Sequence, residues 1–338
     1  MNQNRALAHL RSVRRVGIVA MLAALSVGTT GCANGTAQAP AAPSDLRFSA
    51  HAVVEAVPVH YAIKYLAAAR PDIPNGAIPA LYGPNGGIAD VAGHADTQLL
   101  RHSLAHPDLR IILTVTEGHY RIVTKRSAGI RSMADLRGKK IATVKDSSAA
   151  FYLHRALQAA GLTDGDIAIV ALPLPPKDAA QLLLDGRADA LALWDPEPQI
   201  AINHLGEDVV ILDPDAEYRE LYNLHSTAGK LADPVRREKI VRFVAKLIEA
   251  SEDMRRHPAQ AIILAADVTG YPVYLIRASW PQHTFPATLS PKLLDTLVAE
   301  EAWLATQEGR EARTRDELTM LIDPTIEAEA RVWLRKRK

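Results

Sequence analysis

Two consecutive serines, Ser147 and Ser148, follow a short apolar run at 140–144 and precede a segment, 149–160, whose apolar residues recur at helical spacing. This pattern predicts a strand that turns directly into a helix. The hydroxyls, the first backbone N–H groups and the positive end of the helix dipole could together hold an anion. The alternative is that the serines only cap the helix, which is their more frequent role at such turns.

The elements around this turn alternate between strand and helix. Strands are predicted at 46–50, 88–92, 109–116, 120–124, 167–172, 188–193, 209–212 and 222–226, and helices at 57–69, 96–106 and 177–184. From 233 onward the apolar period is helical, in segments 233–257, 258–267, 271–280, 290–307 and 312–338. The order predicts an α/β fold with parallel sheet, followed by a helical third. Ligands of such sheets bind outside the carboxyl ends of the strands, where loops 52–58, 93–96 and 145–149 are expected.

The composition is that of a globular protein. The 338 residues are 48% apolar and 23% charged, a length that favours two lobes over one core. The net charge is +1, but residues 1–31 contain four arginines and no acids, which leaves 35 basic residues against 38 acidic ones. A nucleic-acid partner is therefore not expected, because phosphate binding needs a basic surface.

The amino terminus predicts export. Arg11, Arg14 and Arg15 precede an apolar run, 16–27, that is too short to span a bilayer but suits a signal peptide, so residues 1–31 are interpreted as one. Cys32 follows directly. The chain has no other cysteine, which excludes disulfides within it, thiolate metal clusters and a cysteine nucleophile in the folded body.

The surroundings of Cys32 resemble the lipobox of bacterial lipoproteins, although Thr29 stands where that motif usually has leucine. The resemblance implies that Cys32 is lipidated and tethers the chain to a membrane. A plain signal peptide with an incidental cysteine is the alternative. Residues 33–44 are small, polar and rich in proline, so with Cys32 they form a predicted flexible tether at 32–44.

Four stretches in the middle of the chain carry a family resemblance: 138–148, 160–167, 184–190 and 194–196. They look like the substrate-binding proteins of ABC importers for nitrate, aliphatic sulfonates and taurine, a superfamily that also contains thiamine-precursor binding proteins. The resemblance implies a type II periplasmic-binding-protein fold, in which two α/β lobes close on a ligand about a hinge. Lobe I would comprise 45–117 and 226–338, and lobe II 118–225. The hinges would lie near 117–120 and 222–226.

Carried over residue by residue, the resemblance implies a ligand-binding set. Ser147, Ser148 and the amide of Ala149 match an anion-holding helix start. The other candidates come from the predicted loops and from the Trp194-Asp195-Pro196 stretch: Glu55, Val57, His94, Asp96, Thr97, Trp194 and Asp195. Trp194 could instead be a core residue, and Asp96 and Thr97 could be helix caps. His94 is interpreted as a polar rim residue, because no second histidine or acid stands at metal-ligand spacing.

One departure from the family bears on the ligand. Only Lys145 and Arg121 supply positive charge near the predicted loops, whereas the acids Glu55, Asp96, Asp195 and Glu197 lie in or near the cleft. A zwitterion such as taurine, or a cationic or neutral heterocycle, would suit these acids as well as a simple anion would.

The sequence therefore favours a lipid-anchored periplasmic or extracytoplasmic receptor that delivers a small solute to an ABC permease. A sensor lipoprotein with the same hinged cleft is one alternative. An enzyme on the same fold is another, but the enzymes of this superfamily depend on a catalytic cysteine or a cysteine- and histidine-rich motif. No catalytic residue, cofactor or metal is expected, and the protein is expected to be a monomer.

Overall fold

The computed structural model describes residues 45–70, 76–83, 87–214 and 218–337. All described residues belong to one compact unit. The predicted signal peptide, Cys32 with its lipid, and the tether at 32–44 lie outside the described residues.

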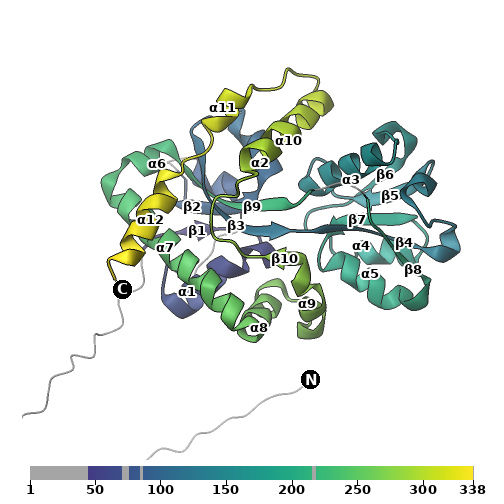
Figure 1. Ribbon diagram of the computed structural model, residues 1–338, viewed down its shortest axis with the longest axis horizontal. Helices are drawn as coiled ribbons and strands as arrows, with labels where there is room; N and C mark the ends of the chain where they lie inside the picture. Colours follow the sequence, from purple (N-terminus) through teal and green to yellow (C-terminus); the bar gives the residue numbers. More distant parts are fainter. Residues whose placement is uncertain (1–44, 71–75, 84–86, 215–217, 338) are drawn as a thin grey trace, which may run out of the picture. The chain divides into compact units, whose positions relative to one another are not determined.

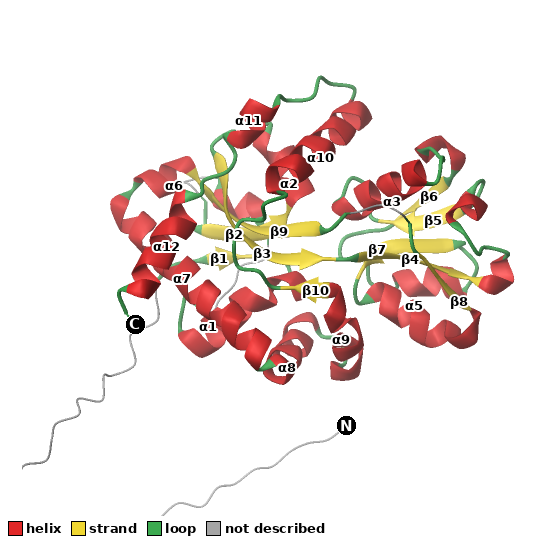
Figure 2. Cartoon of the chain, in the orientation of Figure 1, coloured by secondary structure: helices red, strands yellow, loops and turns green. Residues whose placement is uncertain are grey.

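Two five-stranded sheets organise the fold (Figures 1 and 2). The first has the order β1-β2-β9-β3-β10 and consists of β1 (Phe48–Ser49), β2 (Val91–Ala95), β9 (Glu220–Thr227), β3 (Leu109–Gly118) and β10 (His283–Thr284). The second has the order β6-β5-β7-β4-β8 and consists of β6 (Ala168–Ala171), β5 (Lys140–Thr143), β7 (Ala190–Trp194), β4 (Tyr120–Lys125) and β8 (Val209–Leu212).

Both sheets are mixed rather than parallel throughout. Strands β6, β5 and β7 run parallel, because a helix connects each to the next, whereas β4 pairs antiparallel with β7 and β8. In the first sheet only β1 and β2 are parallel. The predicted parallel arrangement therefore holds for the helix-linked strands alone.

Helices cover both sheets and make up most of the carboxyl-terminal third (Figure 2). They are α1 (Val57–Leu66), α2 (Asp96–Ser103), α3 (Ser148–Ala159), α4 (Ala179–Leu184), α5 (Glu197–Leu205), α6 (Ala228–Ala232), α7 (Pro234–Arg256), α8 (Pro258–Thr269), α9 (Val273–Ser279), α10 (Leu293–Glu308), α11 (Arg315–Thr319) and α12 (Thr325–Arg335).

Within the described ranges no single helix is long and apolar enough to cross a membrane. Helix α8 and the segment Val273–Gln282 meet that criterion only when taken together, as a pair bent by 117°.

Three apolar cores fix the layers. One face of the first sheet packs on α1, α7, α8 and α12, with Phe48 and Phe243 among the buried side chains. Its other face packs on α2, α10 and α11. The third core joins the second sheet to α3, α4 and α5. Each sheet is thus held rigidly by its own helices, and the loops at its strand ends are placed on a fixed frame.

The chain crosses between the sheets twice. His119 alone separates β3 from β4, close to the predicted hinge at 117–120. The chain crosses back to the first sheet between β8 and β9, and residues 215–217 of this segment are not among the described residues. Residues 220–225, assigned above to lobe II, pair with β2 and β3, so the second crossing precedes Glu220 and does not fall at 222–226.

Two other predictions need correction. Strand β2 starts at Val91 and continues to Ala95, because its pairing with β9 extends to Ala95 opposite Tyr222; His94 therefore lies in a strand and not in a loop. The predicted helix 312–338 is interrupted at 320–324, where Ile322 bridges to Ile111 and Pro324 disfavours helical backbone before it.

Candidate functional site

A cavity of about 560 Å³ is lined by residues associated with both sheets. Its size lies within the range of small-ligand pockets. From the first-sheet side it is lined by His51, Ala52, Val53, Glu55, His94, Ala95, Thr97, Gln98, Arg101, Glu220, Tyr222 and Thr269. From the second-sheet side it is lined by Tyr120, Val144, Lys145, Asp146, Ser147, Ser148, Leu172, Leu174, Pro175, Pro176, Lys177 and Trp194.

The start of α3 forms part of the second wall. Ser147 has extended backbone and caps the helix: its Oγ accepts a hydrogen bond from the Ala149 amide at 3.2 Å and donates to the Val144 carbonyl at 2.7 Å. Ser148 is the first helical residue and is buried. Capping and anion binding are therefore compatible here, because the capped helix end faces a cavity.

Tyr120 and Trp194 form the aromatic part of the same wall. They stand opposite each other at the β4–β7 pairing, with ring centroids 6.1 Å apart. The Tyr120 hydroxyl is 2.7 Å from Ser148 Oγ, which connects the strand wall to the helix start. Trp194 is half-buried and lines the cavity, so its ring can contact a ligand as well as the core.

His94 and His51 line the opposite wall, with their rings edge to face at 5.4 Å. Burial, followed by the nearby imidazoles of His51 and His225, holds the pKa of His94 well below its ordinary value, so the ring is neutral at pH 7. Its Nδ1 accepts a hydrogen bond from the Ala95 amide at 2.9 Å. The neutral ring therefore carries its hydrogen on Nε2 and is a donor.

Buried acids line the floor beside β9. Burial, followed by the negative charge of Glu55, raises the pKa of Glu220 well above its ordinary value. Glu55 pairs with His283, whose Nε2 is 3.5 Å from Glu55 Oε1. Burial lowers the pKa of His283, but the hydrogen bond and charge of Glu55 outweigh burial and leave that pKa raised.

Four predicted site residues do not line the cavity. Val57 and Ala149 are buried in the cores. Asp96 is fully buried, and its carboxylate accepts hydrogen bonds from the amides of Thr97 at 2.9 Å and Leu221 at 3.2 Å; burial raises the pKa of Asp96 to about 6. Asp195 is also buried and pairs with Arg121. Glu55, His94, Thr97, Ser147, Ser148 and Trp194 do meet at the cavity.

Sequence reasoning missed several lining residues. Glu220 and Tyr222 alternate on β9, a period-two signal that a strand prediction starting at 220 instead of 222 would have exposed. Residues 172 and 174–177 line the cavity after β6, at the carboxyl end where ligands of parallel strands bind. Gln98 lies in the first turn of α2 and Arg101 in the second, and no pattern in the chain singles them out.

Four contacts join elements packed on the first sheet to elements packed on the second. Gln98 Nε2 and Arg101 Nη1, from α2, donate to the Asp146 carbonyl before α3 at 3.1 and 3.2 Å. The Tyr271 hydroxyl, between α8 and α9, donates to Glu197 of α5 at 2.8 Å. Phe151 of α3 packs on Trp303 of α10, with centroids 5.5 Å apart. Side chains associated with the two sheets are thus in direct contact, at the cavity through Asp146 and elsewhere through Glu197 and Phe151.

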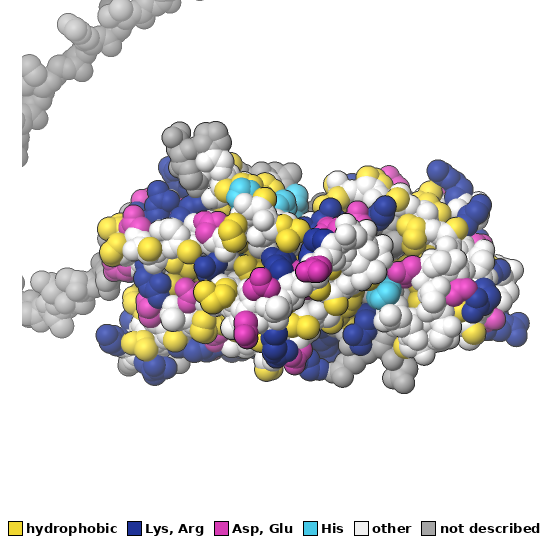
Figure 3. Space-filling model, turned by 90° about the horizontal axis from the view of Figure 1, so that it is seen from above, with side chains coloured by type: hydrophobic (Ala, Val, Ile, Leu, Met, Phe, Trp, Pro, Cys, Tyr) yellow, Lys and Arg dark blue, Asp and Glu magenta, His cyan; other side chains and the backbone are white. Residues whose placement is uncertain are grey.

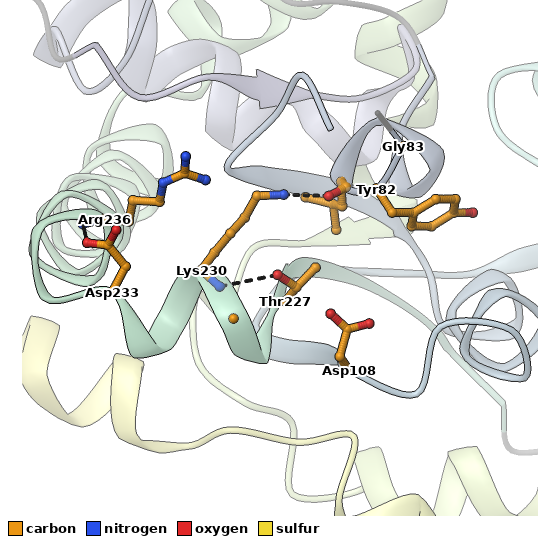
Figure 4. Close-up of a pocket in the computed structure, with 9 residues that line it drawn as sticks. Tyr82, Gly83, Asp108, Thr227, Lys230, Asp233 and Arg236 are labelled. Carbon is orange, nitrogen blue, oxygen red and sulfur yellow. Dashed lines mark hydrogen bonds between the residues drawn. The ribbon is translucent and has the colours of Figure 1, made fainter. Parts of the chain in front are cut away.

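A second cavity, of about 330 Å³, lies beyond the other end of β9 (Figure 4). Lys230 donates through Nζ to the Leu81 carbonyl, and its amide donates to Thr227 Oγ1 at 3.3 Å. Arg236 lies 3.8 Å from Asp90. Its described lining comes from the first-sheet side alone.

The surface adds no strongly charged region on the face seen in Figure 3, where basic and acidic side chains are interspersed. Among the described residues no group of three or more histidine, cysteine, aspartate or glutamate side chains is placed to hold a metal ion. The larger cavity is therefore the candidate site for a small organic ligand.

Comparison with known proteins gives a family and a fold. The profile of the NMT1/THI5-like family matches residues 84–261. A proposed aliphatic sulfonates-binding protein of Escherichia coli (strain K12) is 33% identical over 174 residues, which are 50% of this chain and 51% of that protein. The match thus spans about half the length of that relative.

Two solved structures share the fold. The periplasmic aliphatic sulphonate binding protein SsuA from Escherichia coli superimposes with a TM-score of 0.65 at 22% identity, covering 84% of this chain and 93% of that one. The desulfurization enzyme DszB superimposes with a TM-score of 0.56 at 16% identity, covering 87% of this chain and all of the other. At these identities the likeness establishes the periplasmic-binding-protein fold, and a fold alone does not fix a function.

Proposed function

The chain belongs to the NMT1/THI5-like family, and from that premise we propose that it is a substrate-binding protein that captures a small sulfonate and delivers it to an ABC importer. The E. coli relative, described as aliphatic sulfonates-binding, supports this ligand class over nitrate. The partners are then one small solute and an ABC permease, and the chain acts as a monomer.

The observation that carries the proposal is the start of α3 at the cavity wall. Ser147 and Ser148 place hydroxyls there, and the helix dipole is positive at this end. Neutral His94 adds an N–H donor from the other wall, and Lys145 adds a positive charge beside the serines. Ser148 Oγ, to which the Tyr120 hydroxyl can donate, and His94 Nε2–H would donate from the two sides to a sulfonate, whose three oxygens are acceptors only. Ser147 Oγ would join them by turning away from the Val144 carbonyl.

We propose that lobe I comprises residues 45–118 and 220–338 and that lobe II comprises residues 119–219. The donors are divided between these lobes, so a bound ligand favours their closure. A ligand held first at α3 gains the contacts to His94 and Thr97 only when the lobes meet. Binding then favours the closed form by the difference in affinity between the two forms. The permease would distinguish loaded from empty protein by this change.

We further propose that the protein acts outside the cytoplasm, anchored by lipid at Cys32. The predicted signal peptide and the lipobox-like residues before Cys32 support this location. We also infer a binding protein and not an enzyme. The single cysteine precedes the described fold, so the described lining of the cavity offers no thiol nucleophile.

The proposal is tested by removing the hydroxyls at α3. In the double variant Ser147→Ala, Ser148→Ala we expect binding of ethanesulfonate to weaken by about 1 to 3 kcal/mol, because hydrogen bonds to a charged group are lost. Isothermal titration calorimetry on the full chain measures the change. Thr314→Ala is the control, since Thr314 also caps a helix, α11, but does not line the cavity. Wild-type affinity in the double variant would refute the α3 site.

A further inference from the structure

A tyrosine at the second crossing joins two of the apolar cores. Tyr218 lies between β8 and β9, and its ring packs both on the core of the second sheet and on the core that α2 and α10 share. The ring meets Phe151 of α3 edge to face at 5.2 Å and stacks on Tyr152 of the same helix at 6.4 Å. Because protein interiors are closely packed, a displacement of Tyr218 moves α3, whose first turn forms a wall of the cavity.

The Tyr218 hydroxyl is held by a pair of buried carboxyl groups. It donates to Glu300 Oε1, on α10, at 2.8 Å. Glu300 is in turn hydrogen-bonded to Asp96, the first residue of the neighbouring helix α2 (Figure 1), and both residues are fully buried. Asp96 also accepts a hydrogen bond from the Leu221 amide, near the start of β9, at 3.2 Å. The pair therefore joins α2 and α10 to the segment in which the chain crosses between the sheets.

The contact between the two carboxyl groups requires a proton. Two carboxylates only accept hydrogen bonds and repel each other, so one of them must be protonated to donate to the other. Burial, followed by the negative charge of Asp96, raises the pKa of Glu300 well above its ordinary value. Burial also raises the pKa of Asp96, to about 6. At neutral pH the pair therefore keeps one proton, which it loses only as the pH rises further.

The charged groups around the pair do not offset a second negative charge. Glu220 of β9 raises the pKa of Glu300 further, and Tyr120 of β4 and Tyr218 are neutral donors. The other charged or titratable side chains of α2, α3 and the segment after α10 face different partners: Arg101 faces Asp146, His102 bonds Tyr82, His154 bonds Asp164, and Arg310 and Arg313 bond Glu301. Loss of the proton would thus leave two adjacent buried negative charges without a cation among these groups.

We propose that Asp96 and Glu300 share one proton and that Tyr218 transmits its loss to α3, so that the cavity is closed at acidic pH and opens as the pH rises. The proton leaves to solvent, and repulsion between the two carboxylates then separates α10 from α2. The Glu300 oxygen that orients Tyr218 moves with α10, so α3 is held less firmly. Glu300 does not line the cavity and acts as a positioning residue.

The shared proton is tested by thermal unfolding of the wild type and Glu300→Gln, in which an amide replaces the protonated carboxyl. A group with a raised folded-state pKa stabilises fully below its ordinary pKa and loses that contribution as the pH rises through the folded-state value. Between pH 5 and 9 the unfolding midpoint of the wild type should therefore fall by at least about 2 °C relative to Glu300→Gln. Glu252→Gln, exposed on α7, is the control and should follow the wild type. A difference that does not change with pH would overturn the shared proton.

The transmission is tested on the full chain without any ligand, by acrylamide quenching of tryptophan fluorescence. Trp194 lines the cavity, so its quenching increases when the cavity opens. Quenching of the wild type should rise from pH 5 to 9, whereas in Tyr218→Phe it should not change with pH although the unfolding midpoint still does. Tyr274→Phe is the control, because Tyr274 is 68% exposed on α9. If Tyr218 serves packing alone, its replacement changes quenching equally at all pH values; that result, or a wild-type pH dependence in Tyr218→Phe, would overturn the transmission.

Calorimetry with ethanesulfonate gives a second readout, which rests on the proposed function. Its affinity for the wild type should fall at least about fivefold from pH 5 to 9, and for Tyr218→Phe less than about twofold. Absence of binding at every pH would refute the proposed sulfonate function, and the quenching experiment would still decide the proton switch. Binding that is independent of pH in the wild type would leave the sulfonate function standing and overturn the switch.

Discussion

Replacing Asp195 by alanine should lower the free energy of unfolding by about 3 to 5 kcal/mol, because it leaves a buried cation without its partner. The carboxylate of Asp195 is fully buried, and the Arg121 side chain that bonds it is only 12% exposed. Burial raises the pKa of Asp195, and the charge of Arg121 opposes that rise. Burying two charges costs free energy that their attraction offsets, so removing one partner lowers the free energy of unfolding more than removing both does.

Guanidinium denaturation of the wild type and Asp195→Ala measures this loss. The matched control is Glu238→Ala, which breaks a pair with Arg242 whose two side chains are 63% and 58% exposed; it should cost less than about 1 kcal/mol. The double variant Arg121→Leu, Asp195→Leu should recover part of the loss. Comparable losses in Asp195→Ala and Glu238→Ala would show that burial does not set the strength of the Asp195 pair.

Glu301→Gln should destabilise the fold by about 3 kcal/mol, because one buried carboxylate neutralises two arginines. Glu301 accepts hydrogen bonds from Arg310 at 2.6 Å and from Arg313 at 2.8 Å. Arg313 in turn donates to Ser103 Oγ at 2.8 Å and to the Leu100 carbonyl at 2.9 Å. The network thus attaches the segment after α10 to α2, the helix that carries Thr97, Gln98 and Arg101 to the cavity.

The same carboxylate predicts an acid dependence. Burial alone would raise the pKa of Glu301, but hydrogen bonds from Arg313 and Arg310 outweigh burial and lower the pKa from 4.5 to about 2. A group with a lowered folded-state pKa stabilises fully above its ordinary pKa and loses that contribution as pH falls. The stability difference between wild type and Glu301→Gln should therefore be full at pH 6 and shrink from about pH 4.5 toward 2. Urea denaturation at several pH values measures it, and a constant difference would contradict the assignment.

Local patterns predicted the long elements well. Helix α7 was expected at 233–257 and runs from Pro234 to Arg256, because Asp233 caps it and Pro234 suits a first helical position. Strand β8 matches its predicted range, and the turn into α3 lies where the two serines place it. These features depend on residues close together in the chain, which a sequence displays directly.

Contacts between residues far apart in the sequence could not be predicted. Arg121 and Asp195 were both placed near the cleft, but only the β4–β7 register, with Tyr120 opposite Trp194, makes them partners and removes them from the cavity. The position of the lining residues on β9 has the same origin. Glu220 and Tyr222 reach the site because β9 returns between β2 and β3, and no local pattern specifies that order.

The contacts from Gln98 and Arg101 to Asp146, and from Tyr271 to Glu197, have a kinetic meaning. We expect a solute to enter the cavity after these contacts open, so that encounter and capture are separate steps. The rate of capture would then rise with solute concentration only until it equals the rate at which the contacts open. Beyond that concentration the time needed to load the protein is a property of its own motion and not of the solute supply.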